Sequence, residues 1–173
     1  KDRPGIVAGV TKILFEQGCN LEDSAMSRLG GEFAMMLVFS ASPRLPYQAL
    51  ERAFKPLAHR FRLTIHLKVL TPDEASPHVR GTPHLISVYG ADRPGLVFRT
   101  SALLARAGVN ITDVSTHRTQ PVKGGMTKPL YLMVLEIELP PRLTARRLEQ
   151  RLRRLAKKLG VDVNLRSAEA DVL

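Results

Sequence analysis

The chain has no tryptophan, only one cysteine, and aromatic side chains at 5% of its 173 positions. The single cysteine, Cys19, cannot form a disulfide within the chain, so we expect a reducing, cytoplasmic location rather than a disulfide-stabilised secreted domain. No apolar run approaches the roughly 20 residues that span a bilayer, and no signal-peptide pattern opens the chain. The sequence therefore predicts a globular protein without a membrane segment.

The patterns that mark enzymes are missing as well. There is no Walker or Rossmann glycine pattern and no nucleophile elbow. The five histidines are scattered along the chain without the spacing of metal ligands. They are His59, His66, His78, His84 and His117. We therefore predict that the protein is not an enzyme, and that it has no catalytic residues, no metal site and no cofactor.

The chain does contain one motif that occurs twice. Asp2-Arg3-Pro4-Gly5-Ile6-Val7 is matched 90 positions later by Asp92-Arg93-Pro94-Gly95-Leu96-Val97. Between residues 2 and 23, nine of 22 positions are identical at this offset. Because the match keeps proline, glycine and asparagine at fixed positions, it indicates a duplicated module. The identical positions are Asp2, Arg3, Pro4, Gly5, Val7, Leu14, Gly18, Asn20 and Asp23.

Apolar spacing predicts the same order of elements in both modules. In the first we expect a helix over residues 4–17, strands over 20–28 and 33–39, a helix over 47–59 and a strand over 62–70. In the second we expect a strand over 84–89, a helix from Pro94 to Gly108, strands over 110–119 and 130–137, a helix over 144–159 and a strand over 161–166. A loop over 120–128, with Gly124-Gly125 at its tip, replaces the tight Gly30-Gly31 turn of the first module.

Three prolines carry separate predictions. Pro4 and Pro94 suit the first turn of a helix, where the missing N–H costs nothing. Pro56 falls inside a predicted helix and should kink or shorten it.

The predicted fold is α+β, with two ferredoxin-like βαββαβ modules in tandem. Module 1 covers residues 1–71 and lacks its first strand, residues 72–82 form a linker, module 2 covers 83–166, and 167–173 form a tail. The missing strand would lie centrally in its sheet. We therefore expect the natural protein to have several more residues before Lys1; otherwise another segment or subunit must fill that place.

The repeated turn has the chemistry to hold a zwitterion. A helix that opens after Asp-x-Pro-Gly has unpaired backbone N–H groups and a positive dipole end, which favour a carboxylate. Asp2 and Asp92 offer a carboxylate to an ammonium group, and Asn20 and Asn110 offer an amide that donates and accepts. Each asparagine lies too far along the chain to reach its own turn unless the module folds back or a neighbour supplies it. The same residues are also common where they only build turns and caps.

These motifs resemble those of ACT domains, small ferredoxin-like regulatory modules that commonly bind amino acids. The matching pattern is Asp-Arg-Pro-Gly-(Ile/Leu)-Val, an apolar helix, Gly-x-Asn-(Leu/Ile)-x-Asp and a hydrophobic strand, and it covers nearly the whole chain. Two such domains with little else resemble in particular the glycine cleavage system transcriptional repressor group. The resemblance implies that the turn of one module and the asparagine of its neighbour line a ligand site. The implied ligand-binding residues are Asp2, Gly5, Asn20, Asp92, Gly95 and Asn110.

Most of the net charge of +10 comes from one predicted helix. Between residues 142 and 158 there are eight basic residues, and only Glu149 opposes them. They are Arg142, Arg146, Arg147, Arg151, Arg153, Arg154, Lys157 and Lys158. This face is either a solvated surface or a contact for an acidic protein or a phosphate backbone. The expected buried stripe is Leu148, Leu152, Leu155 and Leu159, and the partner-binding candidates are Arg146, Arg147, Arg151, Arg154 and Lys158.

An RNA-recognition motif shares the predicted topology and is the main rival. That module stacks bases on aromatic residues of its central strands, whereas the strands here are aliphatic and rich in methionine. We therefore expect no direct sequence-specific binding to nucleic acid, while a nonspecific phosphate contact stays open.

The resemblance then implies a cytoplasmic, amino-acid-responsive regulator that forms a homodimer. It would bind a small amino acid, glycine or serine, between ACT modules and control a DNA-binding transcription factor. The alternatives are a basic nucleic-acid-binding protein of ferredoxin-like fold and a regulatory ACT protein for a metabolic enzyme.

Overall fold

The computed structural model describes residues 1–75, 81–119 and 129–168. It divides into two compact units, residues 1–77 and 78–173, each with its own core. No helix in these described ranges is long and apolar enough to cross a membrane. The predicted loop over 120–128 and the end of the predicted tail lie outside the described residues.

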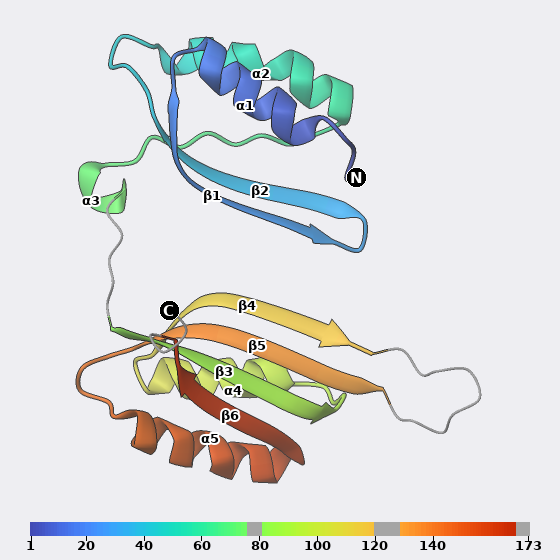
Figure 1. Cartoon of the computed structure of the whole chain (residues 1–173), viewed down its shortest axis with the longest axis vertical. Coiled ribbons are helices and arrows are strands. Elements are labelled where there is room, and N and C mark those ends of the chain that lie inside the picture. The colour runs from blue at the N-terminus through green and yellow to red at the C-terminus, as the bar shows by residue number, and fades with distance from the viewer. Residues whose placement is uncertain (76–80, 120–128, 169–173) are drawn as a thin grey trace. The chain divides into compact units, whose positions relative to one another are not determined.

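The first unit is a two-stranded hairpin with two long helices over one face (Figure 1). Leu14 of the first helix packs with Leu50 and Phe54 of the second, and Leu37 and Phe39 of the hairpin pack against this cluster. The elements are α1 (Ile6–Glu16), β1 (Asn20–Leu29), β2 (Glu32–Ser40), α2 (Tyr47–Phe61) and the short α3 (Pro72–Ala75).

The second unit has the complete βαββαβ order that the sequence predicts. Its four antiparallel strands lie in the order β4-β5-β3-β6, and both helices cover one face of the sheet (Figure 1). Ile86, Met133, Leu135, Ile137 and Leu148 are almost completely buried between sheet and helices. The elements are β3 (Thr82–Ala91), α4 (Leu96–Arg106), β4 (Asn110–Arg118), β5 (Leu130–Leu139), α5 (Ala145–Leu159) and β6 (Val161–Ser167).

The duplication extends to irregularities of the strands. The ladder between β1 and β2 shifts register between Leu21 and Asp23, and the ladder between β4 and β5 shifts between Ile111 and Asp113. The two bulges therefore stand 90 positions apart, at the same offset as the repeated turn. A bulge re-aims the side chains that follow it, so both modules present these strands in the same way.

The strand predicted over residues 62–70 is not formed. Its counterpart β6 pairs only with β3, and the described part of the first unit has no strand in the place of β3. A strand exists only through hydrogen bonds to a neighbour, so the pattern alone cannot make one. The segment still has alternating exposure, and Ile65 and Leu67 pack against the core of the first unit.

Three local predictions about helices need correction. Pro4 and Pro94 precede the helices, which begin at Ile6 and Leu96. Pro56 does not shorten α2, which continues to Phe61, and the alternative, a kink at Pro56, stays a prediction. The buried stripe of α5 consists of Leu148, Leu152 and Ala156, while Leu155 and Leu159 are only partly buried.

Candidate functional site

The repeated turn has the same backbone geometry in both modules. Gly5 has φ +93° and Gly95 has φ +88°, a left-handed conformation that glycine adopts without the strain a Cβ would bring. The carbonyl of each glycine accepts the first hydrogen bond of its helix, from Gly9 N and from Arg99 N, both at 2.9 Å. Among the described residues no side chain caps either glycine. The first-turn N–H groups of α1 and α4 thus form two equivalent anion-attracting ends.

The aspartate of each turn is held by an arginine near the far end of the following strand. Asp2 Oδ2 lies 3.6 Å from Arg28 Nη1, and Asp92 Oδ2 lies 2.9 Å from Arg118 Nε. The backbone also ties the turn to the hairpin, because Asp2 N donates to the carbonyl of Gly31 at 2.9 Å and Asp92 N to that of Pro129 at 3.4 Å. The carboxylates that sequence reasoning assigned to a ligand ammonium are therefore already paired.

Sequence reasoning missed both arginines, although a signal for them was present. Arg28 and Arg118 stand 90 positions apart, which is the offset of the repeat. The identity count ended at residue 23 and so stopped before them. Each of these guanidinium groups is mostly exposed, at 71% and 66% of the side chain, so it can exchange one carboxylate for another.

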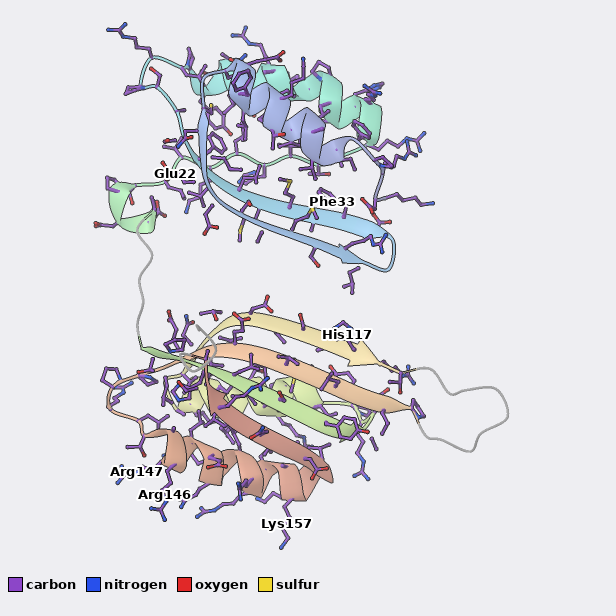
Figure 2. The ribbon with its side chains drawn as sticks, in the orientation of Figure 1. Glu22, Phe33, His117, Arg146, Arg147 and Lys157 are labelled. Carbon is purple, nitrogen blue, oxygen red and sulfur yellow. The ribbon has the colours of Figure 1, made fainter. Side chains whose placement is uncertain are left out.

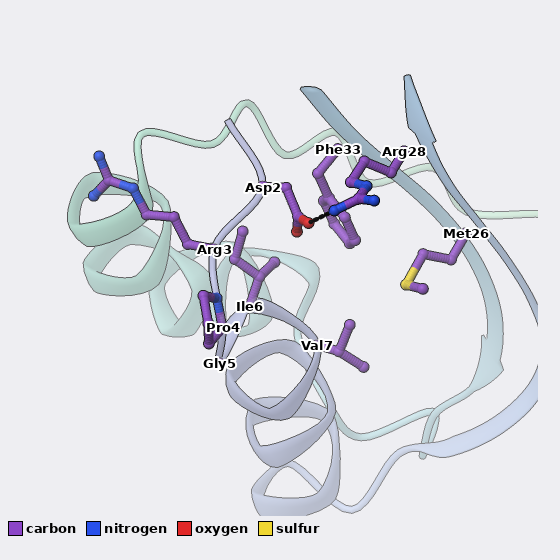
Figure 3. Close-up of a pocket in the computed structure, with 9 residues that line it drawn as sticks. All are labelled: Asp2, Arg3, Pro4, Gly5, Ile6, Val7, Met26, Arg28 and Phe33. Carbon is purple, nitrogen blue, oxygen red and sulfur yellow. Dashed lines mark ion pairs between the residues drawn. The ribbon is translucent and has the colours of Figure 1, made fainter. Parts of the chain in front are cut away.

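In the first module the turn opens into a pocket of about 430 Å³. Figure 3 shows Asp2 directed at Arg28 across the pocket, while Arg3 points away from this pair. The pocket combines the Asp2 carboxylate, the Arg28 guanidinium and an apolar wall, which is a set that matches an amino acid zwitterion with a small or apolar side chain. The apolar part of the lining is Pro4, Ile6, Val7, Met26 and Phe33.

The arginine inside the second motif serves the fold. The guanidinium of Arg93 lies against Gly160, the residue that ends α5 in a left-handed conformation. A cation at this position complements the negative end of the helix dipole. The aspartate and the glycine of the motif thus belong to the candidate site, whereas Arg93 joins the turn to α5.

Each module keeps its asparagine away from its own turn. Asn110 lies at the start of β4, and Arg118 at its end is eight positions further along the extended strand, roughly 26 Å away. Its Nδ2 donates to Glu138 Oε2 at 3.1 Å. Asn20 has the same place on β1, opposite Ser40 of β2. Asn110 instead lines a second pocket of about 410 Å³, together with Phe98, Ser101, Ala102, Ala105, Val109 and Ile111.

The basic residues of α5 all lie on its exposed side. Arg146, Arg147 and Lys157 project from the helix away from the sheet (Figure 2). The helix begins after Thr144, whose Oγ1 accepts a hydrogen bond from the backbone N–H of Arg147 at 3.4 Å. The remaining basic side chains from Arg142 to Lys158 are also exposed. Sequence reasoning placed this surface on the solvent side, and the structure agrees.

The other side chains that could be reactive or bind a metal show no sign of a second site in the described residues. Burial raises the pKa of the Cys19 thiol, which disfavours the nucleophilic thiolate form. The ring Nδ1 of the buried His84 lies 3.1 Å from the carbonyl of Thr82. Within the described ranges no three His, Cys, Asp or Glu residues gather as metal ligands would.

Comparison with known proteins agrees with the repeat and the fold. Models of the ACT domain match residues 1–68 and 84–153. The chain is 29% identical to the glycine cleavage system transcriptional repressor of Escherichia coli K12 over 159 residues, which cover 92% of this chain and 81% of that protein.

Two further relatives match one module or both. A UPF0237 protein of Methanopyrus kandleri is 32% identical over 83 residues, covering 47% of this chain and 83% of that protein. A crystal structure of a protein of unknown function from Galdieria sulphuraria superposes with a TM-score of 0.73 at 26% identity, covering 96% of this chain and 92% of the other. The chain therefore belongs to the ACT-domain family and contains two ACT domains in tandem.

Proposed function

We propose that the protein is a cytoplasmic, non-enzymatic regulator that responds to a small amino acid. The observation that carries the proposal is the turn repeated before α1 and α4. In both copies an aspartate–arginine pair lies beside a helix start that no side chain of the described residues caps. Family membership supports it, as does the likeness over most of the chain to a glycine cleavage system transcriptional repressor.

The proposed ligand is glycine or serine. Its carboxylate would take the first-turn N–H groups beside Gly5 or Gly95 together with the guanidinium of Arg28 or Arg118. Its ammonium group would take the carboxylate of Asp2 or Asp92. The ligand thus enters between the two members of an existing ion pair and satisfies both, so neither charge is left without a partner.

The asparagines complete this site only if another module supplies them. We propose that two copies of the chain form a homodimer in which Asn20 and Asn110 meet the turns of a neighbouring ACT module. Because a ligand shifts an equilibrium only by its difference in affinity between two arrangements, this shared site gives the amino acid a means of changing the assembly. The controlled partner is a DNA-binding transcription factor.

The first experiment is calorimetric titration of the full-length protein with glycine, then with serine and a wider set of amino acids. The proposal predicts saturable binding with about one or two sites per chain, one for each turn. Leucine and methionine test the apolar wall of the first pocket. If no amino acid of the set gave a binding signal, amino-acid sensing would be refuted. The protein would then be a pair of ACT domains that has the fold but binds no amino acid.

A further inference from the structure

The charge of the protein is concentrated in one unit. Residues 1–77 contain ten Lys and Arg against eight Asp and Glu, whereas residues 78–173 contain sixteen against eight. The first unit is thus nearly neutral, and the second has a net charge of +8. Seven of these charges come from residues 142–158 alone. The duplicated fold does not need this charge, because the corresponding helix α2 has only Arg52, Lys55 and Arg60 against Glu51.

The basic residues of α5 form regular rows along the helix. Arg147, Arg151, Arg154 and Lys158 follow one another at spacings of four, three and four residues, which places them on one face. Arg146, Arg153 and Lys157 form a second row beside them. We call these seven side chains the α5 basic face. All are exposed, and Arg153 of this face forms an ion pair with Glu149 at 2.7 Å.

Lys157 and Lys158 suit the negative end of the helix dipole, but the rest of this arrangement works against the stability of the helix. Arg146 and Arg147 occupy its first turn, at the positive end of the dipole, where an acidic residue would be favourable. Arg147 and Arg151, and likewise Arg154 and Lys158, are like charges four residues apart, which repel. Residues that break local rules without a structural gain are expected at functional sites. An anionic partner would remove the repulsion.

The spacing of the charges indicates what kind of anion fits. From Arg146 to Lys158 the helix rises about 18 Å and has six net positive charges, so one charge falls on about every 3 Å. A strand of duplex DNA has one phosphate per about 3.4 Å of axis. Arginine also binds phosphate oxygens in bidentate fashion. Aromatic residues for base stacking are missing from α5, so the face suits a backbone rather than bases.

We propose that the α5 basic face binds the phosphate backbone of duplex DNA without sequence specificity. The choice of DNA rests on the proposed function, because a regulator of a DNA-bound transcription factor works beside a duplex. The contact would hold the regulator at its partner's site, while recognition of the base sequence stays with the partner.

The test measures binding of the full-length protein to a fluorescent duplex of arbitrary sequence and about 30 base pairs by anisotropy, from about 50 to about 200 mM salt. The wild type should bind with a strongly salt-dependent affinity, with a log–log slope near −4. The triple variant Arg147→Glu, Arg151→Glu, Arg154→Glu should bind at least about 100-fold more weakly at low salt, with a slope reduced by about three.

The matched control is Arg44→Glu, Arg52→Glu, Lys55→Glu, which changes three exposed basic residues of the first unit and gives the same net charge. Its affinity for the duplex should stay within about threefold of the wild type. Equal losses in both variants would overturn the proposal, because net charge rather than the α5 basic face would then govern binding. Failure of the wild type to bind the duplex while it binds polyglutamate would also overturn it and point to an acidic protein.

Amino-acid titration of the same variants separates this proposal from the proposed function. The α5 triple variant should keep the ligand affinity of the wild type, since none of its positions lies at a turn. If the duplex is bound and no amino acid is, the DNA contact stands without the sensor; if the reverse holds, the sensor stands without the DNA contact. Circular dichroism verifies that both variants are folded.

Discussion

Arg118 Nε lies 2.9 Å from Asp92 Oδ2, and the same pair occurs 90 positions earlier, where Arg28 Nη1 lies 3.6 Å from Asp2 Oδ2. In each module the pair joins the turn before the first helix to the strand that leaves its other end. The arginine of each pair is well exposed and the aspartate is partly exposed, so in water the pair itself adds little to stability. A pair kept in both copies with little value for folding has the character of a binding element.

Replacing either arginine should therefore affect ligand binding more than folding. Arg28→Ala and Arg118→Ala should each weaken amino-acid binding at the affected turn by about 1.5–3 kcal/mol, the usual range for a hydrogen bond to a charged group. The free energy of unfolding should change by less than about 1 kcal/mol. Calorimetric titration and urea denaturation measure the two quantities.

A control for this prediction is Lys12→Ala, which breaks the exposed ion pair with Glu16 on α1. This variant should bind amino acids as the wild type does. If Arg28→Ala and Lys12→Ala leave affinity equally unchanged, the arginine does not contact the ligand and serves only to position the turn.

The left-handed glycine of each turn gives a prediction about stability. Gly5→Ala and Gly95→Ala should each lower the free energy of unfolding by about 1–2 kcal/mol, the cost of a Cβ in the left-handed region. The added Cβ would meet only the ring of Phe61 or the guanidinium of Arg99, each at 3.7 Å, so steric overlap contributes nothing. Urea denaturation tests this, and Gly95→Asn should cost less, because asparagine tolerates this conformation. An alanine variant as stable as the wild type would contradict the assigned backbone geometry.

The asparagine of the second module tests whether ligand sites are shared between modules. Asn110→Ala should weaken amino-acid binding by about 1–3 kcal/mol, the cost of a lost polar partner. Folding should change little, because the hydrogen bond to Glu138 lies at the solvent-exposed surface and the half-buried Glu138 carboxylate can bond to water instead. Asn164→Ala, on the exposed side of β6, is the matched control. Normal binding by folded Asn110→Ala would remove this residue from the site and leave the turn to act alone.

The sequence predicted most of the elements because their signals are local. Apolar spacing and the Gly30-Gly31 turn are contained within single helices or one hairpin, and the repeat allowed each module to support the assignment of the other. The prediction of a strand over residues 62–70 was wrong for a nonlocal reason. Its alternating side chains are present, but a ladder requires a neighbouring strand that the described first unit does not contain.

The candidate site was predictable only in part, for a related reason. Asp2 and Gly5 stand out in the sequence because turn chemistry is local. Arg28 lies 26 positions away, and it reaches Asp2 only because the hairpin returns the strand end to the turn, where Gly31 also accepts the N–H of Asp2. Sequence reasoning found the turn and missed its partner, although the 90-residue offset marks both arginines.

The last prediction concerns the helix that bears the α5 basic face. Thr144 caps α5, and Arg147 occupies the third helical position, where a glutamate would complete a capping box. Arg147→Glu should therefore raise the free energy of unfolding by about 0.5–1 kcal/mol, since it also favours the dipole and removes the repulsion from Arg151. Arg153→Glu makes the same change of charge six residues later but loses the ion pair with Glu149, so it should lower stability by about 0.5 kcal/mol. Urea denaturation at low salt measures both. If the two variants change the free energy of unfolding in opposite directions, Arg147 is retained at a cost to the fold, as a binding residue would be. If both change it in the same direction, charge alone sets the stability of this helix.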